Sequence, residues 1–227
     1  MKKKNKRLYI IISLLVLSLA VTYTDAFIKP NYFTKIPIKV IAFLAIPISY
    51  FLIYKKEFNQ FKRLFKHKKN DIKKALSIGI PIYILIVTAY YLTRNIIDYS
   101  NVAPNLTNSM GITKDNFIYV TLYISILNSF LEEFFFRGYG FITLKKYTSK
   151  KFAYIFSPIL FAIYHIGMLI NSFHPGIIIL LLIGLFIGGY IFNYLNEKNN
   201  NIYVSWLVHM LCNLGINTVG AILFGIF

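Results

Sequence analysis

Long apolar runs alternate with short basic segments along the whole chain, and this alternation constrains the fold more than any other feature. A helix needs about 20 apolar residues to cross a bilayer. The runs that approach this length cover residues 8–27, 36–54, 75–93, 117–144, 152–170, 177–195 and 202–227. In lipid, a helix satisfies every backbone group within its own segment. We therefore expect an all-α polytopic transmembrane helix bundle with about seven spans.

The composition favours a membrane protein over a soluble one. Of the 227 residues, 57% are hydrophobic and only 15% are charged, which is too apolar for an ordinary soluble domain. In a soluble protein the net charge of +17 would suggest nucleic acid, but here the Lys and Arg residues lie between apolar runs. This pattern predicts a cytoplasmic amino terminus, contact with anionic lipid of the bilayer and no nucleic-acid partner.

The chain divides into two expected parts. Residues 1–116 hold three spans and the basic segment 55–74, in which Phe and Leu at helical spacing indicate an amphipathic helix on the cytoplasmic leaflet. Residues 117–227 hold the other four spans. The first run, 8–27, has a second interpretation as a cleaved signal peptide. Because this run continues past the only small residues that would suit a cleavage site, we prefer the interpretation as a first membrane span.

Glycines in the last two runs predict where helices approach one another or break. Gly184, Gly188 and Gly189 give the run 177–195 a small-residue face, which is typical of close packing between membrane helices. Gly215 and Gly220 are the positions at which the last run could break. We therefore expect a tight contact on the sixth span, and the seventh span could be broken near either of these two glycines.

Three charged residues, Glu132, Glu133 and Arg137, lie inside the run 117–144. An ionised residue near the bilayer centre costs roughly 2.5–3.5 kcal/mol on insertion scales, so each needs a partner, a proton or water. Glu133 and Arg137 stand four residues apart with the acid first, the orientation that favours an ion pair on a helix. Glu132 lies about 100° around the helix from Glu133. We therefore predict that the partner of Glu132 comes from another helix.

His165, His209 and Asn213 lie inside two other apolar runs. Counted from the inner ends of their spans at about 1.5 Å per residue, Glu132 and His165 lie roughly 18–20 Å deep and His209 about 10 Å deep. These three side chains are therefore able to meet at mid-membrane or in the cytoplasmic half. A single buried His or Asn often only bonds a neighbouring helix, but so many at compatible depth favour a functional site.

These residue types suit hydrolysis of an amide in two alternative arrangements. In both, Glu132 takes a proton from water as a general base. In the first, a divalent metal such as Zn²⁺ activates the water, and the candidate ligands are Glu132, His165 and His209, since two His and one Glu form a known catalytic zinc set. In the second, which we prefer, no metal takes part. His165 then shares the water with Glu132, while His209 and Asn213 donate hydrogen bonds to the oxyanion.

Three motifs in these runs resemble those of a known family. Glu132 to Arg137 fits EExxxR, Phe161 to His165 fits FxxxH, and His209 to Asn213 fits HxxxN. Their order and spacing, over residues 117–217, are similar to the CPBP intramembrane endopeptidases, which include CAAX prenyl proteases and bacteriocin-processing or immunity proteins. The resemblance implies an all-helical hydrolase, described in that family as a metalloprotease, with 117–227 as its catalytic core. Because members of the family often have eight helices, it also leaves an eighth span possible. The site residues that it implies are Glu132, Glu133, Arg137, His165, His209 and Asn213.

The resemblance also implies a peptide or protein substrate at the membrane. Cleavage would serve CAAX-type processing or, in bacteria, peptide maturation, signalling or bacteriocin self-immunity. The bias toward Lys, Ile, Asn, Tyr and Phe is typical of an AT-rich genome and favours a bacterial plasma membrane. Two other functions stay open: a catalytically silent scaffold for immunity or regulation, and an ion-coupled transporter whose carboxylates and histidines relay charge. The sequence shows no inverted repeat, which argues against the transporter.

Overall fold

The computed structural model describes residues 3–170 and 173–227, apart from the side chain of Tyr32. Every regular element in these residues is a helix, and seven helical segments are long and apolar enough to cross a membrane, which confirms the predicted bundle. The spans are α1 (Lys3–Tyr23) with the π-helix η1 (Thr24–Ile28), α2 (Tyr32–Ile53), α4 (Asp71–Thr93), the composite span Phe117–Lys146, α8 (Lys150–Leu169), α9 (Pro175–Asn199) and α10 (Tyr203–Leu223). Shorter helices are η2 (Lys55–Glu57), α3 (Phe58–Leu64) and α5 (Val102–Met110).

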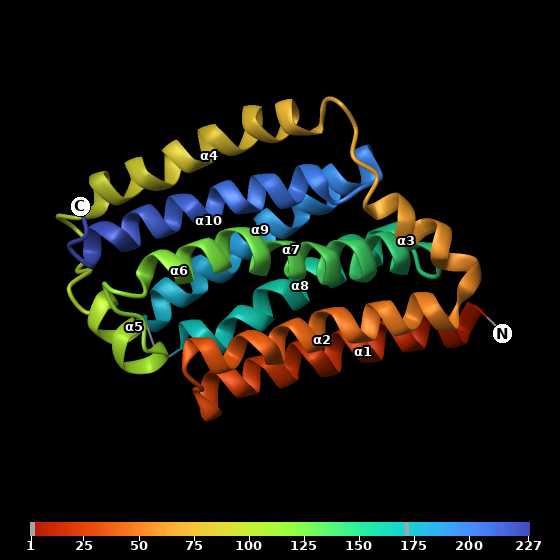
Figure 1. Cartoon of the computed structure of the whole chain (residues 1–227), viewed down its shortest axis with the longest axis horizontal. Helices are drawn as coiled ribbons and strands as arrows, with labels where there is room; N and C mark the ends of the chain where they lie inside the picture. Colours follow the sequence, from red (N-terminus) through yellow and green to blue (C-terminus); the bar gives the residue numbers. More distant parts are fainter. Residues whose placement is uncertain (1–2, 171–172) are drawn as a thin grey trace.

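The composite span lies in the middle of the bundle (Figure 1). Helices α1 and α2 form one edge, and α4 packs along α10 at the other. Helices α8 and α9 pass behind the composite span in this view, and both contact it. The two termini lie at opposite ends of the bundle, as an odd number of spans requires. The composite span is therefore packed between α1, α2, α8, α9 and α10.

Five helical pieces follow one another without a break in the composite span. They are α6 (Phe117–Leu122), the π-helix η3 (Tyr123–Asn128), α7 (Ser129–Glu132), a second π-helix η4 (Glu133–Thr143) and the 3-10 helix η5 (Leu144–Lys146). The sequence predicts one regular α-helix here, so the two π segments are a correction. All residues of η4 are buried, and the apolar length that predicts the span does not specify the turn of the helix. π-Segments are rare and occur frequently at functional sites.

Aromatic side chains of η4 form the core around which the other spans pack. Five of them are at most 1% exposed: Phe134, Phe135, Phe136, Tyr139 and Phe141. Phe43 of α2 stacks on Phe135 with the ring centroids 4.5 Å apart. Lipid tails are as apolar as these rings, so close packing holds the helices together in place of the hydrophobic effect. The core therefore fixes the register of α2 against η4.

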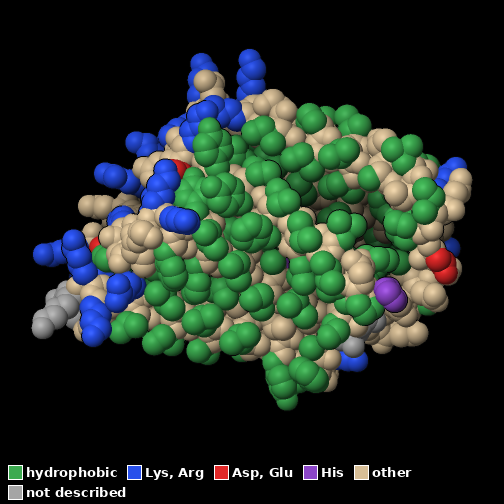
Figure 2. All heavy atoms as spheres, turned by 180° about the vertical axis from the view of Figure 1, so that it is seen from behind, with side chains coloured by type: hydrophobic (Ala, Val, Ile, Leu, Met, Phe, Trp, Pro, Cys, Tyr) green, Lys and Arg blue, Asp and Glu red, His purple; other side chains and the backbone are tan. Residues whose placement is uncertain are grey.

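The outer surface suits a bilayer. Hydrophobic side chains cover the middle of the face in Figure 2, and Lys and Arg gather at one end. That end holds the start of α1 and the link between α2 and α4. This asymmetry is the one that the positive-inside rule requires for a cytoplasmic amino terminus.

The basic segment 55–74 is not one amphipathic helix, contrary to the prediction. Helix α3 covers only seven of its residues, and a non-helical link joins α3 to α4. Leu64 is 1% exposed, and the ring centroid of Phe65 lies 5.6 Å from that of Phe134 in η4. The apolar side of the segment therefore packs on the protein. A helical spacing of apolar residues is the same for a protein partner and for lipid, so the sequence could not separate the two.

Two predictions about the last two spans were wrong in part. A Cβ added at Gly184 or Gly188 would meet no atom within 4 Å, whereas one at Gly189 would lie 3.0 Å from the Cβ of Pro158 in α8. Of these three glycines, only Gly189 therefore permits a close approach of α9 to α8. Helix α10 continues without a break through both of its candidate glycines. Between α4 and the composite span lies α5, which the sequence does not predict.

Glu57 joins three segments at the basic end of the bundle. Its carboxylate pairs with Lys6 of α1 at 2.9 Å and with Lys146 of η5 at 2.8 Å. It also accepts a hydrogen bond from the hydroxyl of Tyr147. Burial opposes the ionisation of Glu57, but the hydrogen bonds from Lys146, Tyr147 and Lys6 outweigh it and lower the pKa of Glu57 from 4.5 to about 2.

We predict that Glu57→Gln lowers thermal stability at neutral pH and weakens its acid dependence. A carboxyl whose pKa is lower in the folded state stabilises fully above its unfolded pKa of 4.5 and loses that contribution as the pH falls toward about 2. Thermal unfolding in detergent, measured across this pH window, should therefore show a smaller decline for Glu57→Gln than for the wild type. Equal declines would contradict the stabilising role of Glu57.

Candidate active site in the composite span

Glu133 and Arg137 form the ion pair that the sequence predicts. The Oε1 of Glu133 lies 3.3 Å from Nη1 of Arg137, and both side chains are fully buried. The guanidinium of Arg137 lies over the ring of Phe161, 3.9 Å from its centroid, and near the ring of Phe192. Gly189 leaves room for this group, because a Cβ there would lie 3.1 Å from Nη2 of Arg137. Aromatic faces and one carboxylate thus compensate a cation that is shielded from solvent.

His209 of α10 lies between the two carboxylates. Its Nδ1 is 3.1 Å from Oε1 of Glu133, and its Nε2 is 3.6 Å from Oε2 of Glu132. An ionised carboxylate only accepts hydrogen bonds, so Nδ1 of His209 carries a proton toward Glu133. The rings of Phe161 and Phe192 pack on the imidazole. Nε2 of His209 is therefore held in one direction, toward Glu132.

The two oxygens of Glu132 have different surroundings. Oε1 accepts a hydrogen bond from Nδ2 of Asn128 at 2.6 Å and another from the hydroxyl of Tyr164 at 3.0 Å. The Nζ of Lys39 lies 3.9 Å from the same oxygen. Oε2 is instead the oxygen nearer to His209. Glu132 thus has partners on other helices, as predicted, and they hold the carboxylate by Oε1.

Sequence reasoning missed two residues that contact Glu132. Lys39 lies within α2, and its Nζ donates to Oδ1 of Asn128 at 3.1 Å. Tyr164 precedes His165 and was not singled out. The available signal for Lys39 was its spacing of four residues from Lys35 at the start of an apolar run, which places both on one face of a helix. The sequence does not show which span this face meets, because the order of the helices in space does not follow from local spacing.

His165 lies in α8 beside these groups. Its Nδ1 is 2.7 Å from the carbonyl oxygen of Phe161, and its ring contacts those of Phe161 and Tyr164. A carbonyl accepts, so Nδ1 of His165 carries a proton and Nε2 is the acceptor of the neutral ring. His165 interacts electrostatically with Glu132 and His209. Among the described residues, however, no hydrogen bond joins it to either.

Asn213 lies one helical turn beyond His209 on α10. Its amide Nδ2 donates to the carbonyl oxygen of Ile124 in the π-helix η3 at 3.1 Å. One turn further, Nδ2 of Asn217 donates to the hydroxyl of Ser125 at 3.3 Å. These bonds join α10 to η3. The amide nitrogen of Asn213 carries two hydrogens, so its bond to Ile124 fixes the group and uses only one of them.

The metal hypothesis requires Glu132, His165 and His209 to share one ion. Donor atoms of a zinc site lie about 2.0–2.2 Å from the metal, and the 3.6 Å between Glu132 and His209 suits two such donors. Within residues 3–170 and 173–227, however, no group of three or more His, Cys, Asp or Glu residues is arranged to hold a metal ion. The three-ligand set does not fit this geometry, and we derive no chemical step through a metal.

Part of the chain matches a known family. Residues 114–215 fit the family model described as Type II CAAX prenyl endopeptidase Rce1-like. These residues are an Rce1-like domain. The match confirms the resemblance found in the motifs and supports a membrane endopeptidase, which implies a bilayer and a peptide substrate in general terms. The chain is thus a multi-pass membrane protein. Neither the curated proteins nor the solved structures give a match.

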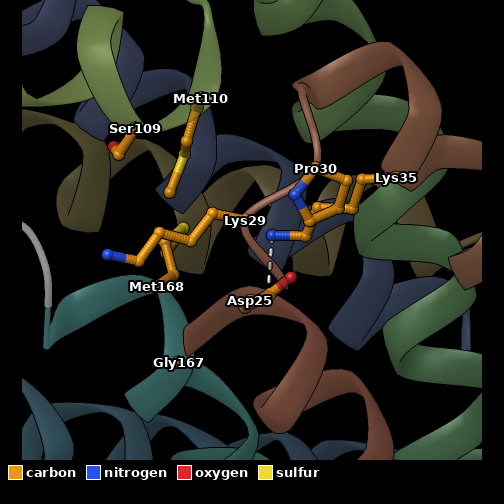
Figure 3. A pocket seen from close by; sticks show the side chains of 8 residues that line it. All are labelled: Asp25, Lys29, Pro30, Lys35, Ser109, Met110, Gly167 and Met168. Atoms are coloured by element: carbon orange, nitrogen blue, oxygen red, sulfur yellow. Dashed lines mark ion pairs between the residues drawn. The ribbon is translucent and has the colours of Figure 1, made fainter. Parts of the chain in front are cut away.

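Helix α2 lies outside the Rce1-like domain but is anchored close to it. Asp25 of η1 and Lys35 of α2 form a buried ion pair at 2.7 Å (Figure 3). The pair borders a cavity of about 10 Å³ beside Gly167 of α8, which has room for about one water molecule. A Cβ at Gly167 would lie 2.4 Å from the carbonyl oxygen of Thr22, so only glycine permits this approach of α8 to α1.

We predict that Glu133→Gln and Arg137→Gln each impair folding of the Rce1-like domain, because each leaves the other charge buried and unpaired. Breaking such a pair costs typically about 3–5 kcal/mol in soluble proteins. The double variant removes both charges and should be milder. Yield of monodisperse protein and its thermal midpoint in detergent measure the effect. A double variant no better than either single variant would refute the ion-pair interpretation.

Proposed function

We propose that the chain hydrolyses a peptide bond in a membrane-associated peptide or protein, with Glu132 as the general base for the attacking water. The two unequal oxygens of Glu132 are the observation that carries this proposal. Oε1 is held by Asn128 and Tyr164, while Oε2 faces Nε2 of His209 across 3.6 Å. A base needs one oxygen within reach of the proton that it takes and a fixed orientation. Glu132 has both.

In the proposed reaction, water lies between Oε2 of Glu132 and Nε2 of His165. Its oxygen attacks the scissile carbonyl carbon while one of its protons passes to Glu132. The oxyanion accepts the second N–H of the Asn213 amide and a hydrogen bond from His209. When the C–N bond breaks, Glu132 returns the proton to the departing amine nitrogen. The products are a new carboxyl terminus and a new amino terminus, and Glu132 is again a carboxylate.

Glu133 and Arg137 have a different proposed role. Glu133 accepts from Nδ1 of His209, and Arg137 compensates the charge of Glu133. This arrangement holds the ring of His209 so that Nε2 donates to the oxyanion. Residues 117–227 supply these groups. The function in peptide maturation, signalling or bacteriocin self-immunity at a bacterial plasma membrane remains a prediction from the sequence.

We predict that Glu132→Gln abolishes cleavage and leaves folding intact, since Gln retains a hydrogen-bond acceptor for Asn128 and Tyr164 but cannot take a proton. Purified full-length protein in lipid nanodiscs, incubated with a fluorogenic library of membrane peptides, gives the measurement. Glu197→Gln is the matched control, because Glu197 pairs with Lys145 and Lys150 away from Glu132. Cleavage that survives Glu132→Gln would refute the mechanism. Absence of cleavage by the wild type, with a cellular phenotype retained in the variant, would support a scaffold.

Metal dependence separates the two arrangements of the histidines. If the histidines do not bind a metal, His209→Ala and Asn213→Ala should each reduce turnover by roughly 10²–10³, the loss expected for one oxyanion donor. A chelator should then have little effect on activity. Asn213 is informative because an amide is a poor zinc ligand beside His and Glu. Elemental analysis of active protein is the second readout. One stoichiometric zinc that disappears in His209→Ala would overturn the metal-free mechanism.

A further inference from the structure

We infer that Lys39 of α2 is a positioning residue for Glu132, a role that rests on the proposed function of Glu132 as the base. Lys39 lies outside the matched residues 114–215 and carries none of the family motifs. Its Nζ donates to Oδ1 of Asn128 at 3.1 Å, and Nδ2 of Asn128 donates to Oε1 of Glu132 at 2.6 Å. The ammonium group thus orients the amide that orients the base.

Charge compensation leads to the same assignment. Two carboxylates stand next to each other in the composite span, and Arg137 pairs with Glu133. Among the described Lys and Arg residues, Lys39 alone forms an ion pair with Glu132, at 3.9 Å. An intramembrane carboxylate needs such a partner to stay ionised, and only the ionised form accepts a proton from water. The ammonium of Lys39 also lies over the ring of Tyr164, 4.9 Å from its centroid.

The position of α2 is fixed on both sides of Lys39. One turn toward the outer end, Lys35 is held by Asp25 (Figure 3). One turn toward the inner end, Phe43 stacks on Phe135 of η4. These two contacts leave α2 little freedom to slide or rotate. The contacts of Lys35 and Phe43 therefore direct the long side chain of Lys39 to Asn128. This side chain is 12% exposed.

Lys39 acts on the oxygen of Glu132 that does not face His209. Its ion pair is with Oε1, whereas Oε2 faces Nε2 of His209. Lys39 therefore does not occupy the place where water would bind, and no step of the proposed reaction transfers a proton to it. Loss of its charge should impair the chemical step and leave the binding of peptide unchanged.

The test compares Lys39→Ala, Lys39→Gln and Lys39→Arg in the nanodisc cleavage assay with the peptide that the wild type cleaves. A general base contributes roughly 10²–10⁴-fold to the rate, so loss of its orientation in the Ala and Gln variants should lower kcat at least about tenfold. KM should stay within about twofold. Lys39→Arg restores a cation and should recover most of kcat. Lys29→Ala, an exposed lysine before α2, is the control and should behave as the wild type.

Rescue by a small amine separates positioning from a merely structural role. Ethylamine added to Lys39→Ala should raise kcat in a saturable manner, and it should have no such effect on Glu132→Gln. Thermal midpoints measured in parallel identify any variant that fails to fold, and Lys39→Gln then replaces Lys39→Ala. Wild-type kcat in both neutral variants, or a loss shared by Lys39→Arg without rescue by amine, would overturn the inference. Cleavage that survives Glu132→Gln would instead refute the proposed function.

Discussion

Adjacent carboxylates inside a membrane span impose the constraint on which the rest of the structure depends. Each would cost several kcal/mol as an unpaired charge in lipid, and they point in different directions around the helix. Glu133 turns toward Arg137 and His209. Glu132 turns toward Asn128, Tyr164 and, from α2, a lysine. No single neighbouring helix supplies all of these partners, so several helices pack around the composite span.

The separation of the two carboxylates also separates their chemistry. Glu133 shares one oxygen between Arg137 and His209 in a fully buried setting, which suits a permanent charge that orients a histidine. Glu132 is held by one oxygen and presents the other toward His209. Two carboxylates in different environments commonly take different catalytic roles. The π-segments that flank Glu132 belong to the same region.

The sequence predicts what depends on composition and local spacing. Apolar length yields the seven spans, and a spacing of four residues yields the pair Glu133 and Arg137. Depth counting also brings His209 to the acidic stretch. The sequence could not predict the contact of Lys39 with Glu132, because the packing of α2 against the composite span depends on how the helices are arranged in space. The π-turns of η3 and η4 escaped because an apolar run predicts a span from its length and does not specify the turn of the helix.

The central claim is that Glu132 activates a water molecule that attacks the peptide carbonyl directly. A single turnover in water enriched in ¹⁸O, with enzyme in excess over peptide, tests this most directly through the mass of the new carboxyl terminus. Direct attack incorporates one solvent oxygen in the first turnover, so the product should carry the full enrichment of the solvent. If Glu132 were instead a nucleophile that forms an acyl-enzyme, its own oxygen could enter the product. An unlabelled first-turnover product, with ¹⁸O found in the Glu132 side chain, would contradict the account.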